Sequence, residues 1–328
     1  MQWRRRFLMA RILLIDPTPT PFVERLRRLF LADADLDVVP SYSEEDLSRR
    51  AAEAEILLVV HRKVDARLLS FVPRVRFVQR VGVGYDNLDL AALQAAGVAA
   101  AYTPGANAVA VAEHTILLML ALLKRFVAAE SATRQGGWSM MELAQAGLGD
   151  LSNAKVGLVG FGNIGRAVAE RLAPFGSRLL YMSRHAVDPA TEQQCGVRYA
   201  SLDDLLASST IVSLHLPLTE STRGLIGEAE LAKMPTGAFL INTSRGEVLD
   251  EAALRRALVS GKLGGAALDV LCNERPGGNP FADLPQVIVT PHIAGGSRAA
   301  IERALQMAVA NVVRFLHGES PLDLVPMP

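Results

Sequence analysis

The sequence predicts an α/β protein built from two doubly wound parallel sheets, and three observations support this fold class. Short β-branched or leucine-rich runs alternate with helical patterns from one end of the chain to the other. These runs are apolar on both faces, which is typical of parallel strands covered on each side by crossover helices. The length of 328 residues suggests two domains, since one domain usually takes about 150 residues.

In the amino-terminal part, strands are expected at Ile12–Ile15, Ile56–Val60, Phe77–Val81 and Val98–Ala101. Helical periodicity separates these strands over Phe22–Leu31, Ser43–Ala54 and Leu88–Ala96. Ser43 and Asp46 have the spacing of a capping box, so the second helix should begin at Ser43.

The pattern changes at Pro104, which is the expected domain boundary on the amino-terminal side. A helix from about Val109 to Ala129 follows, and it should be buried between domains or at a subunit interface because it is apolar all round. An irregular, glycine-rich stretch from Gln135 to Asn153 comes next, and a long amphipathic helix from Ser297 to His317 ends the chain. Between these two segments, six strands are expected at Val156–Val159, Leu179–Met182, Ile211–Leu214, Phe239–Asn242, Ala266–Val270 and Val287–Thr290. Six strands with intervening helices are typical of a complete dinucleotide-binding fold.

The composition excludes several kinds of partner and site. The chain has 34 Lys and Arg against 34 Asp and Glu, so no electrostatic reason exists to expect nucleic acid or an anionic membrane as partner. Half of the residues are apolar, which indicates a sizeable core. Cys195 and Cys272 are the two cysteines, and neither a disulfide framework nor a metal-ligand spacing is present, so no metal is expected.

The amino terminus resembles a twin-arginine export signal at Arg4-Arg5-Arg6-Phe7-Leu8. Such a signal needs an apolar stretch of roughly 7–15 residues, whereas Arg11 interrupts the sequence at once. Met1–Leu8 is therefore interpreted as an extension before the first strand, with Met9 as an alternative start. No stretch approaches the roughly 18 apolar residues of a membrane helix. The sequence predicts a soluble, cytoplasmic protein.

A glycine fingerprint follows the strand that begins at Val156. Gly160-Phe161-Gly162-Asn163-Ile164-Gly165 has the Gly-x-Gly-x-x-Gly spacing between a strand and a helix. Gly160 should make the tight turn, Gly162 should let the backbone approach a pyrophosphate, and Gly165 should let the helix pack closely. The amino terminus of that helix then offers N–H donors to the phosphates.

The end of the next strand bears on which dinucleotide is bound. NAD-binding folds usually carry an acidic residue there, which binds the ribose 2′-hydroxyl. This chain has Ser183 and Arg184 instead, and a guanidinium is suited to a 2′-phosphate. The sequence favours NADP(H), with NAD(H) as the alternative if Arg184 stacks on adenine or lies in solvent.

Three charged or titratable side chains follow the ends of candidate strands: Arg245, Glu274 and His292. Ligands of open α/β sheets bind at the carboxyl ends of the strands, so these side chains should converge beside the dinucleotide. Each of them alone has an ordinary structural explanation, as a turn, a solvated charge or a core histidine. Their joint position in one dinucleotide fold indicates a catalytic site.

The sequence resembles the D-2-hydroxyacid dehydrogenase family, including glyoxylate and hydroxypyruvate reductases, over nearly the whole chain. The matching stretches are Val81–Asn87, Thr103–Thr115, the glycine fingerprint, His215–Pro217, Asn242–Asp250, Ala267–Glu274 and Thr290–Gly295. The resemblance implies two Rossmann-like domains, with the dinucleotide domain (104–293) inserted into a flavodoxin-like substrate domain (1–103 and 294–328). It also implies a homodimer whose interface includes the apolar helix after Pro104.

The same resemblance assigns roles to residues of this chain. It implies Arg245, Glu274 and His292 as the catalytic residues, and Asp269 as the partner of the nicotinamide carboxamide. The cofactor residues implied in addition to the fingerprint, Ser183 and Arg184 are His215, Leu216, Pro217, Thr222, Thr243, Ser244, Asp269 and Gly295. The chain departs from the family pattern at Leu271, Cys272 and Arg275, which bears on loop shape more than on chemistry.

These residues predict a reduction of a 2-oxo acid. Arg245 would pair with the substrate carboxylate and ketone, and the Val83-Gly84 backbone would bind the carboxylate from the other domain. His292 would donate a proton to the substrate oxygen, and Glu274 would stabilise the imidazolium. The leading prediction is an NADPH-dependent reductase of glyoxylate or hydroxypyruvate type. The alternatives are an NAD-dependent dehydrogenase of another 2-hydroxy acid and a dinucleotide-sensing corepressor.

Two further features have two interpretations each, and a third has one. His61-Arg62-Lys63 either favours a small, polar or doubly anionic substrate or forms a solvated turn. Trp138 either enters a neighbouring subunit's active site or anchors packing. His114, beside Glu113, is interpreted as a structural histidine with its hydrogen bonds satisfied.

Overall fold

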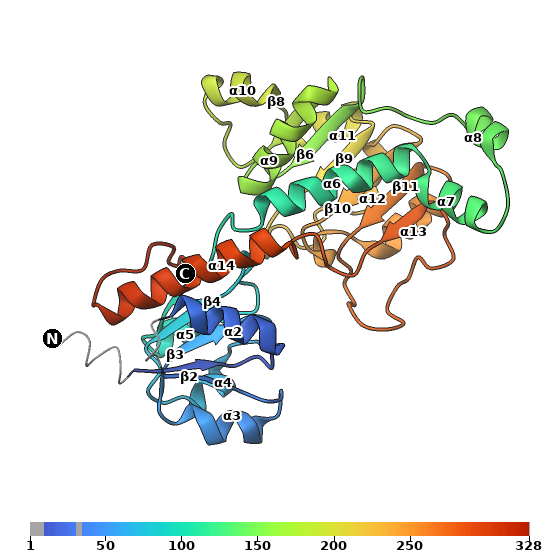
Figure 1. Cartoon of the computed structure of the whole chain (residues 1–328). Coiled ribbons are helices and arrows are strands. Elements are labelled where there is room, and N and C mark those ends of the chain that lie inside the picture. Colours follow the sequence, from blue (N-terminus) through green and yellow to red (C-terminus); the bar gives the residue numbers. More distant parts are fainter. Residues whose placement is uncertain (1–9, 31–34, 328) are drawn as a thin grey trace. The chain divides into compact units, whose positions relative to one another are not determined.

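The computed structural model describes residues 10–30 and 35–327 (Figure 1). Its contacts divide the chain into two units, one formed by residues 1–107 and 297–328 and the other by residues 108–296. The boundaries expected from the sequence were 103/104 and 293/294. The expected amino-terminal extension Met1–Leu8, the alternative start Met9 and the end of the first helix at Leu31 lie outside the described residues.

Unit 1 contains a parallel sheet of five strands in the order β2-β1-β3-β4-β5, the flavodoxin-like order. The strands are β1 (Arg11–Leu14), β2 (Asp35–Val38), β3 (Ala54–Val59), β4 (Phe77–Arg80) and β5 (Ala99–Ala101). The helices are α2 (Thr20–Leu29), α3 (Glu44–Ala51), α4 (Ala66–Ser70), α5 (Leu90–Ala95) and α14 (Arg298–Leu316). Side chains of α2 and α14 pack in one apolar cluster and those of α3, α4 and α5 in another, so both faces of the sheet are covered.

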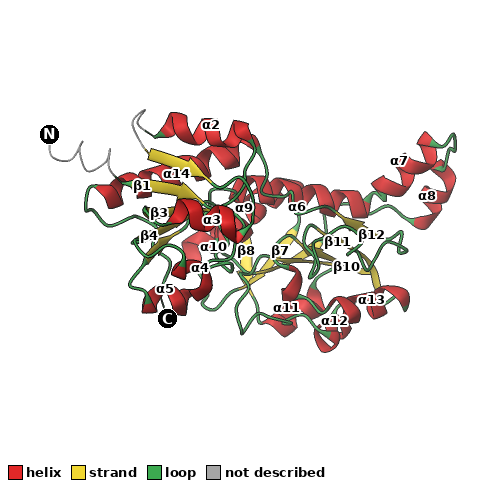
Figure 2. Ribbon diagram, turned by 90° about the horizontal axis from the view of Figure 1, so that it is seen from below, coloured by secondary structure: helices red, strands yellow, loops and turns green. Residues whose placement is uncertain are grey.

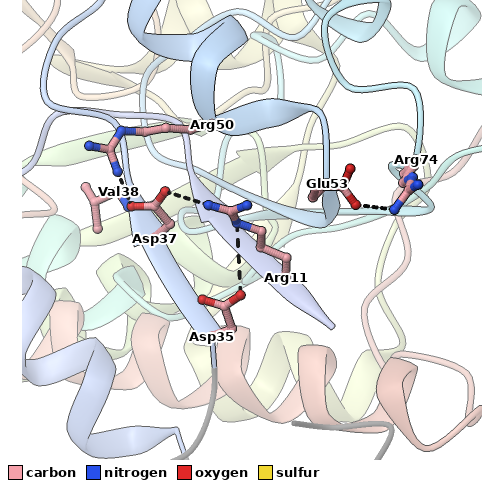
Figure 3. Close-up of polar contacts among 7 residues, drawn as sticks. All are labelled: Arg11, Asp35, Asp37, Val38, Arg50, Glu53 and Arg74. Carbon is pink, nitrogen blue, oxygen red and sulfur yellow. Dashed lines mark hydrogen bonds and ion pairs between the residues drawn. The ribbon is translucent and has the colours of Figure 1, made fainter. Parts of the chain in front are cut away.

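Strand β2 was not expected from the sequence, and its charges explain why. Its four residues include Asp35 and Asp37, which do not give the pattern of a buried strand. Figure 3 shows how they are paired: Arg11 Nη2 lies 3.4 Å from Asp37 Oδ2, and Arg50 Nη1 lies 2.5 Å from Asp37 Oδ1. A charged edge strand of this kind protects the sheet against pairing with another chain.

Unit 2 contains a parallel sheet of seven strands in the order β12-β11-β10-β9-β6-β7-β8, the Rossmann order with one strand added. The strands are β6 (Lys155–Val159), β7 (Arg178–Met182), β8 (Val197–Tyr199), β9 (Ile211–Leu214), β10 (Ala238–Asn242), β11 (Leu263–Leu268) and β12 (Val287–Val289). Six of these seven strands were expected; β8 was missed because it is a three-residue edge strand with two exposed residues. The predicted fold class is therefore confirmed.

Helices cover both faces of this second sheet (Figure 2). Helices α6 (Ala108–Leu123) and α9 (Asn163–Leu172) pack in one apolar cluster. The opposite cluster includes α11 (Leu202–Ser208), α12 (Glu228–Lys233) and α13 (Glu251–Val259). The remaining helices are α7 (Phe126–Arg134), α8 (Met140–Ala146), α10 (Pro189–Cys195) and the short η1 (Ala173–Phe175) and η2 (Gly246–Val248).

Two expectations about helices need correction. The single helix expected from Val109 to Ala129 is broken at Arg125, where φ is +48°, and α6 packs on α9, β10 and β11 of its own unit. The stretch from Gln135 to Asn153, expected to be irregular, contains α8. The predicted cap at Ser43 is present, since its side chain accepts from the Asp46 N–H. The capping box is not, because the Asp46 carboxylate accepts from Ser41.

Candidate active site

The glycine turn joins β6 to α9, and each glycine has a different reason to be there. Gly160 has φ +103°, and a Cβ on it would lie 2.4 Å from the His215 carbonyl oxygen. A Cβ on Gly165 would lie 2.3 Å from the Gly160 carbonyl oxygen, so α9 packs closely against the turn. A Cβ on Gly162 would meet nothing within 4 Å. Both clashes are with backbone, which cannot give way as a flexible side chain can.

The start of α9 fits a dinucleotide phosphate. Gly162 is the N-cap, and no side chain caps the helix. The first N–H groups of a helix have no partner within it, and together with the helix dipole they bind anions. The open space beside Gly162 therefore lies next to unpaired donors, and Phe161, Asn163 and Ile164 belong to the same turn.

Ser183 and Arg184 follow β7, the strand next to β6. The Ser183 hydroxyl donates to the His185 carbonyl oxygen at 2.5 Å. Arg184 is exposed, and within the part of the chain that the structure describes no carboxylate forms an ion pair with it. Among the described residues, therefore, no carboxylate neutralises this guanidinium.

His215 follows β9 and closes the other side of the glycine turn. Its Nε2 lies 2.9 Å from Ser213 Oγ, whereas its Nδ1 is buried without a hydrogen-bond partner among the described residues. Burial lowers the pKa of His215 to about 4, so the ring is neutral at pH 7. Further along the loop, the Thr222 hydroxyl donates to the Pro217 carbonyl oxygen at 2.7 Å, and the Leu216 side chain lies against the Gly160 turn.

The turn after β10 carries Arg245. Asn242 holds this turn, since its Oδ1 accepts from the Ser244 N–H and its Nδ2 donates to the Arg245 carbonyl oxygen. Thr243 and Ser244 are buried, at 7% and 8% exposed. Their hydroxyls bond to Thr115 Oγ1 and Asn242 Oδ1, which leaves their backbone groups as the obvious contacts for a cofactor. A guanidinium nitrogen of Arg245 donates to the Ser244 carbonyl oxygen at 2.7 Å.

Asp269 follows β11 and anchors the loop after β12. Its side chain is almost completely buried, at 1% exposed. The carboxylate accepts from the Ile293 N–H at 3.0 Å, the Ala294 N–H at 2.8 Å and the Thr290 hydroxyl at 2.5 Å. A carboxylate has about four lone-pair directions, so the nicotinamide carboxamide predicted as its partner would have one direction left. Gly295 lies directly after this anchored segment.

Glu274, on the loop after β11, forms a pair with His292, on the loop after β12. His292 Nδ1 lies 2.9 Å from Glu274 Oε2, and the two side chains are 48% and 40% exposed. His292 has φ +53°, a conformation that costs a non-glycine residue about 1–2 kcal/mol. Its N–H donates to the Asp269 carbonyl oxygen at 2.8 Å. The surrounding hydrogen bonds thus hold the backbone where the imidazole can meet Glu274.

The three predicted catalytic residues come from one edge of the sheet. Arg245, Glu274 and His292 follow β10, β11 and β12, which are neighbours in the sheet and parallel. Gly246 lies so close to the Leu271 backbone that a Cβ would be 2.2 Å from its carbonyl carbon, so the Arg245 turn and the chain leading to Glu274 are in contact. The glycine turn leaves the same edge at the end of β6, which lies two strands beyond β10 in the sheet.

Val83 and Gly84 belong to unit 1, where they follow β4. The Gly82 carbonyl oxygen accepts from the Thr103 N–H at 3.1 Å. A Cβ on Gly82 would lie 2.5 Å from Arg80 Nη1, so the guanidinium of Arg80 packs against this loop. The loop is accordingly shaped by its glycine and by a cation that the sequence analysis did not identify.

Arg62 does not form the exposed cationic turn that was one interpretation of His61-Arg62-Lys63. Its guanidinium donates to the Ile15 and Tyr42 carbonyl oxygens at 3.1 and 2.5 Å and lies over the Tyr42 ring. The buried Asp16 carboxylate accepts the N–H groups of residues 60–62. Arg62 is therefore a structural residue, and the proposed substrate preference cannot be based on it.

His114 has the hydrogen bond expected of a structural histidine, with Nε2 3.1 Å from Thr290 Oγ1. Sequence reasoning missed Thr290, which joins His114 to Asp269, because the partners lie far apart in the chain. Trp138 is 81% exposed in the segment between α7 and α8, so it does not anchor packing among the described residues.

Residues 10–30 and 35–327 contain neither a metal-binding cluster nor a membrane-spanning helix. No group of three or more His, Cys, Asp and Glu side chains in these ranges is arranged to hold a metal ion. No helix there is both long and apolar enough to cross a membrane.

Comparison with known proteins gives consistent matches. Residues 116–294 match the family model described as D-isomer specific 2-hydroxyacid dehydrogenase, NAD binding domain. A glyoxylate reductase from Thermococcus litoralis is 38% identical over 281 residues, which is 84% of each chain. A D-3-phosphoglycerate dehydrogenase from Mycobacterium tuberculosis is 38% identical over 274 residues, 83% of this chain and 51% of that one. The crystal structure of a glyoxylate reductase from Paecilomyes thermophila superposes with a TM-score of 0.85 at 31% identity, covering 97% of this chain and 98% of that one.

Proposed function

The chain belongs to the D-isomer specific 2-hydroxyacid dehydrogenase family, and we propose that it reduces glyoxylate or hydroxypyruvate with NADPH. A 2-hydroxyacid oxidoreductase using a nicotinamide dinucleotide is the activity that the family supports. The observation that carries the catalytic assignment is the Glu274–His292 pair at 2.9 Å, because it fixes which ring nitrogen can transfer a proton.

His292 is the proton donor in this proposal. When bound, the reduced nicotinamide supplies a hydride to the carbonyl carbon of the substrate. The carbonyl oxygen gains negative charge and takes a proton from His292 Nε2, since Nδ1 is held by Glu274. The Glu274 carboxylate stabilises the imidazolium before transfer and keeps the ring oriented. In the reverse direction the same nitrogen accepts the proton.

Arg245 orients the substrate in this proposal. A guanidinium matches the two oxygens of a carboxylate and also polarises a neighbouring ketone. Arg245 follows β10, between the glycine turn and the strand that leads to His292. Val83 and Gly84 of unit 1 would contribute backbone N–H groups to the substrate carboxylate. The discontinuous unit 1 is accordingly proposed as the substrate domain.

The preference for NADPH rests on the residues after β7. A 2′-phosphate needs a cation and no neighbouring carboxylate, and the exposed Arg184 has no ion-pair partner within the described chain. Ser183 stands where an acidic residue would repel the phosphate. The description of the matching family domain names NAD, so an NAD-dependent dehydrogenase of another 2-hydroxy acid is the alternative.

A homodimer is proposed from exposed apolar side chains on α6, α7, α8 and the segment that joins the last two helices. They are Leu117, Phe126, Val127, Trp138, Met140 and Met141, each between 53% and 81% exposed. Phe, Trp and Met are enriched in protein interfaces, and an exposed group of this kind marks an interaction surface. A second copy would cover these residues.

Steady-state kinetics with both cofactors tests the proposal. Purified protein is assayed with NADPH or NADH against glyoxylate, hydroxypyruvate, pyruvate, 2-oxoglutarate and phenylpyruvate. We expect the highest kcat/KM with NADPH and one of the first two acids. Faster turnover of phenylpyruvate would contradict the assignment to a small substrate, and a clear preference for NADH would support the alternative.

A further inference from the structure

A buried chain of hydrogen bonds connects helix α6 to the loop that carries His292. His114 Nε2 lies 3.1 Å from Thr290 Oγ1 and 3.5 Å from Asp269 Oδ1, and Thr290 Oγ1 lies 2.5 Å from Asp269 Oδ1. The side chains of His114 and Asp269 are 13% and 1% exposed. This chain of hydrogen bonds therefore runs through the interior of unit 2, where no solvent competes for the hydrogen bonds of Asp269.

The direction of the protons in this chain follows from the chemistry of its members. A carboxylate can only accept, so the Thr290 hydroxyl gives its proton to Asp269. The hydroxyl oxygen can then only accept from the imidazole, which places a proton on His114 Nε2. Each hydrogen bond polarises the next one, so the connected hydrogen bonds are stronger together than they would be separately.

The Asp269 end of this hydrogen-bond chain holds the backbone immediately after His292. Asp269 Oδ1, which receives the Thr290 proton, also accepts from the Ile293 N–H, and Oδ2 accepts from the Ala294 N–H. His292 itself has φ +53°, a conformation that persists only where the surroundings impose it. The position of the Asp269 carboxylate therefore sets the position of the left-handed turn.

We propose that His114 is a positioning residue for His292 and acts through Thr290 and Asp269. This inference rests on the proposed role of His292 as proton donor. Because His114 bonds to Thr290 and is not part of the Glu274–His292 pair, its loss should act on the turn and on proton transfer more than on substrate binding. The loss should loosen the turn and misplace the imidazole during proton transfer.

Four variants of the full-length protein test this proposal. His114→Leu removes the donor, His114→Gln keeps an N–H at the end of a side chain, and Thr290→Val removes the connecting hydroxyl with little change in volume. Glu113→Gln is the matched control, since its carboxylate is on the same helix, 65% exposed and 3.9 Å from Arg171. Each variant is assayed for kcat, KM and NADPH affinity, and for hydrogen exchange over the segment that contains Ile293 and Ala294.

We expect His114→Leu and Thr290→Val each to lower kcat about tenfold, the effect of losing one buried hydrogen bond. KM for the 2-oxo acid should change less than about twofold, and His114→Gln should recover most of kcat. The Ile293–Ala294 segment should exchange faster in His114→Leu and Thr290→Val, but not in Glu113→Gln. A double variant, His114→Leu/Thr290→Val, should be no worse than the more damaging single variant, because both changes break the same hydrogen-bond network around Asp269.

Two results would overturn the inference: unchanged exchange and kcat in both His114→Leu and Thr290→Val, or effects that add fully in the double variant. The exchange measurement is independent of turnover. If the wild-type protein reduces none of the acids tested, the proposed function fails, and exchange of the Ile293–Ala294 segment still decides whether His114 positions the turn.

Discussion

Glu274 and His292 are joined through the ring Nδ1 at 2.9 Å, and this leaves Nε2 as the nitrogen that can exchange a proton with a substrate. Both side chains are partly exposed, so a ligand can approach the imidazole. The carboxylate fixes the orientation of the ring. The proposed reduction depends on this pair more than on any other contact in unit 2.

Removing either reacting side chain should therefore abolish most of the activity. His292→Ala and Arg245→Ala should each lower kcat/KM by about 10²-fold or more, since they remove the proton donor and the group that polarises the carbonyl. Steady-state kinetics with the best 2-oxo acid measures the loss. Near-wild-type turnover in both variants would refute the assignment of the site.

Glu274→Gln separates orientation from charge. The amide can still bond to His292 Nδ1 but cannot stabilise an imidazolium, so we expect a decrease in kcat of about tenfold or more. Glu251→Gln, at a neighbouring carboxylate that accepts the Cys272 N–H, is the control and should keep its turnover. Equal kcat for Glu274→Gln and the wild type would show that the carboxylate only orients the ring.

Arg184 should decide between the two dinucleotides. Arg184→Ala should raise KM for NADPH by about 10- to 100-fold, the effect of losing a charge-assisted hydrogen bond to phosphate. KM for NADH should change little, and Ser183→Asp should shift the preference further toward NADH. Arg198→Ala is the control, because Arg198 is an exposed arginine on the neighbouring strand β8. Equal losses with both cofactors would indicate that Arg184 does not contact the 2′-phosphate.

His215 should make the stability of the protein depend on pH below neutrality. Burial lowers its pKa from 6.5 to about 4, so between these values the unfolded chain binds a proton that the folded chain does not. The free energy of unfolding should therefore fall as the pH decreases from about 6.5 to 4, by up to about 3 kcal/mol.

The measurement is urea denaturation at pH 7 and pH 5, with His215→Gln compared with the wild type. The variant should lose less stability between the two pH values, whatever its stability at pH 7. His185→Gln, at an exposed histidine, is the control and should follow the wild type. Identical losses for wild type and His215→Gln would contradict the effect of burial on this ring.

Charge placed on α7 should separate the proposed dimer. Phe126 is 59% exposed, and Phe126→Asp would bury an unpaired carboxylate in the interface, which is strongly unfavourable. Size-exclusion chromatography with light scattering should show a dimer for the wild type and a monomer for the variant. Phe175→Asp, at a phenylalanine that is 41% exposed on η1, should remain a dimer. A monomeric wild type would exclude this interface.

Sequence patterns were sufficient for features that depend on local chemistry. The glycine turn, the cap at Ser43 and the strands with apolar residues on both faces follow from short stretches, and the structure has them. Strand β2 has alternating acidic residues and β8 has only three residues, so neither gives a strong periodic signal. Strands of this kind are formed by pairing with a neighbour and not by their own sequence.

Contacts between distant segments were beyond the sequence patterns. The pairing of Glu274 with His292 was anticipated from the resemblance to the family, which assigns both residues to one catalytic site. The bond between His114 and Thr290 connects residues 176 positions apart and has no local signature. Arg62 was misread for a related reason, since the carbonyl groups it binds belong to Ile15 and Tyr42 on other segments.

The most direct test of the central claim is the oxidation of NADPH and NADH by the wild-type protein in the presence of the five 2-oxo acids, with His292→Ala assayed in parallel. The proposed function predicts turnover of glyoxylate or hydroxypyruvate with NADPH, and a loss of about 10²-fold or more in the variant. No oxidation of either cofactor with any acid, or equal rates for the two proteins, would contradict it.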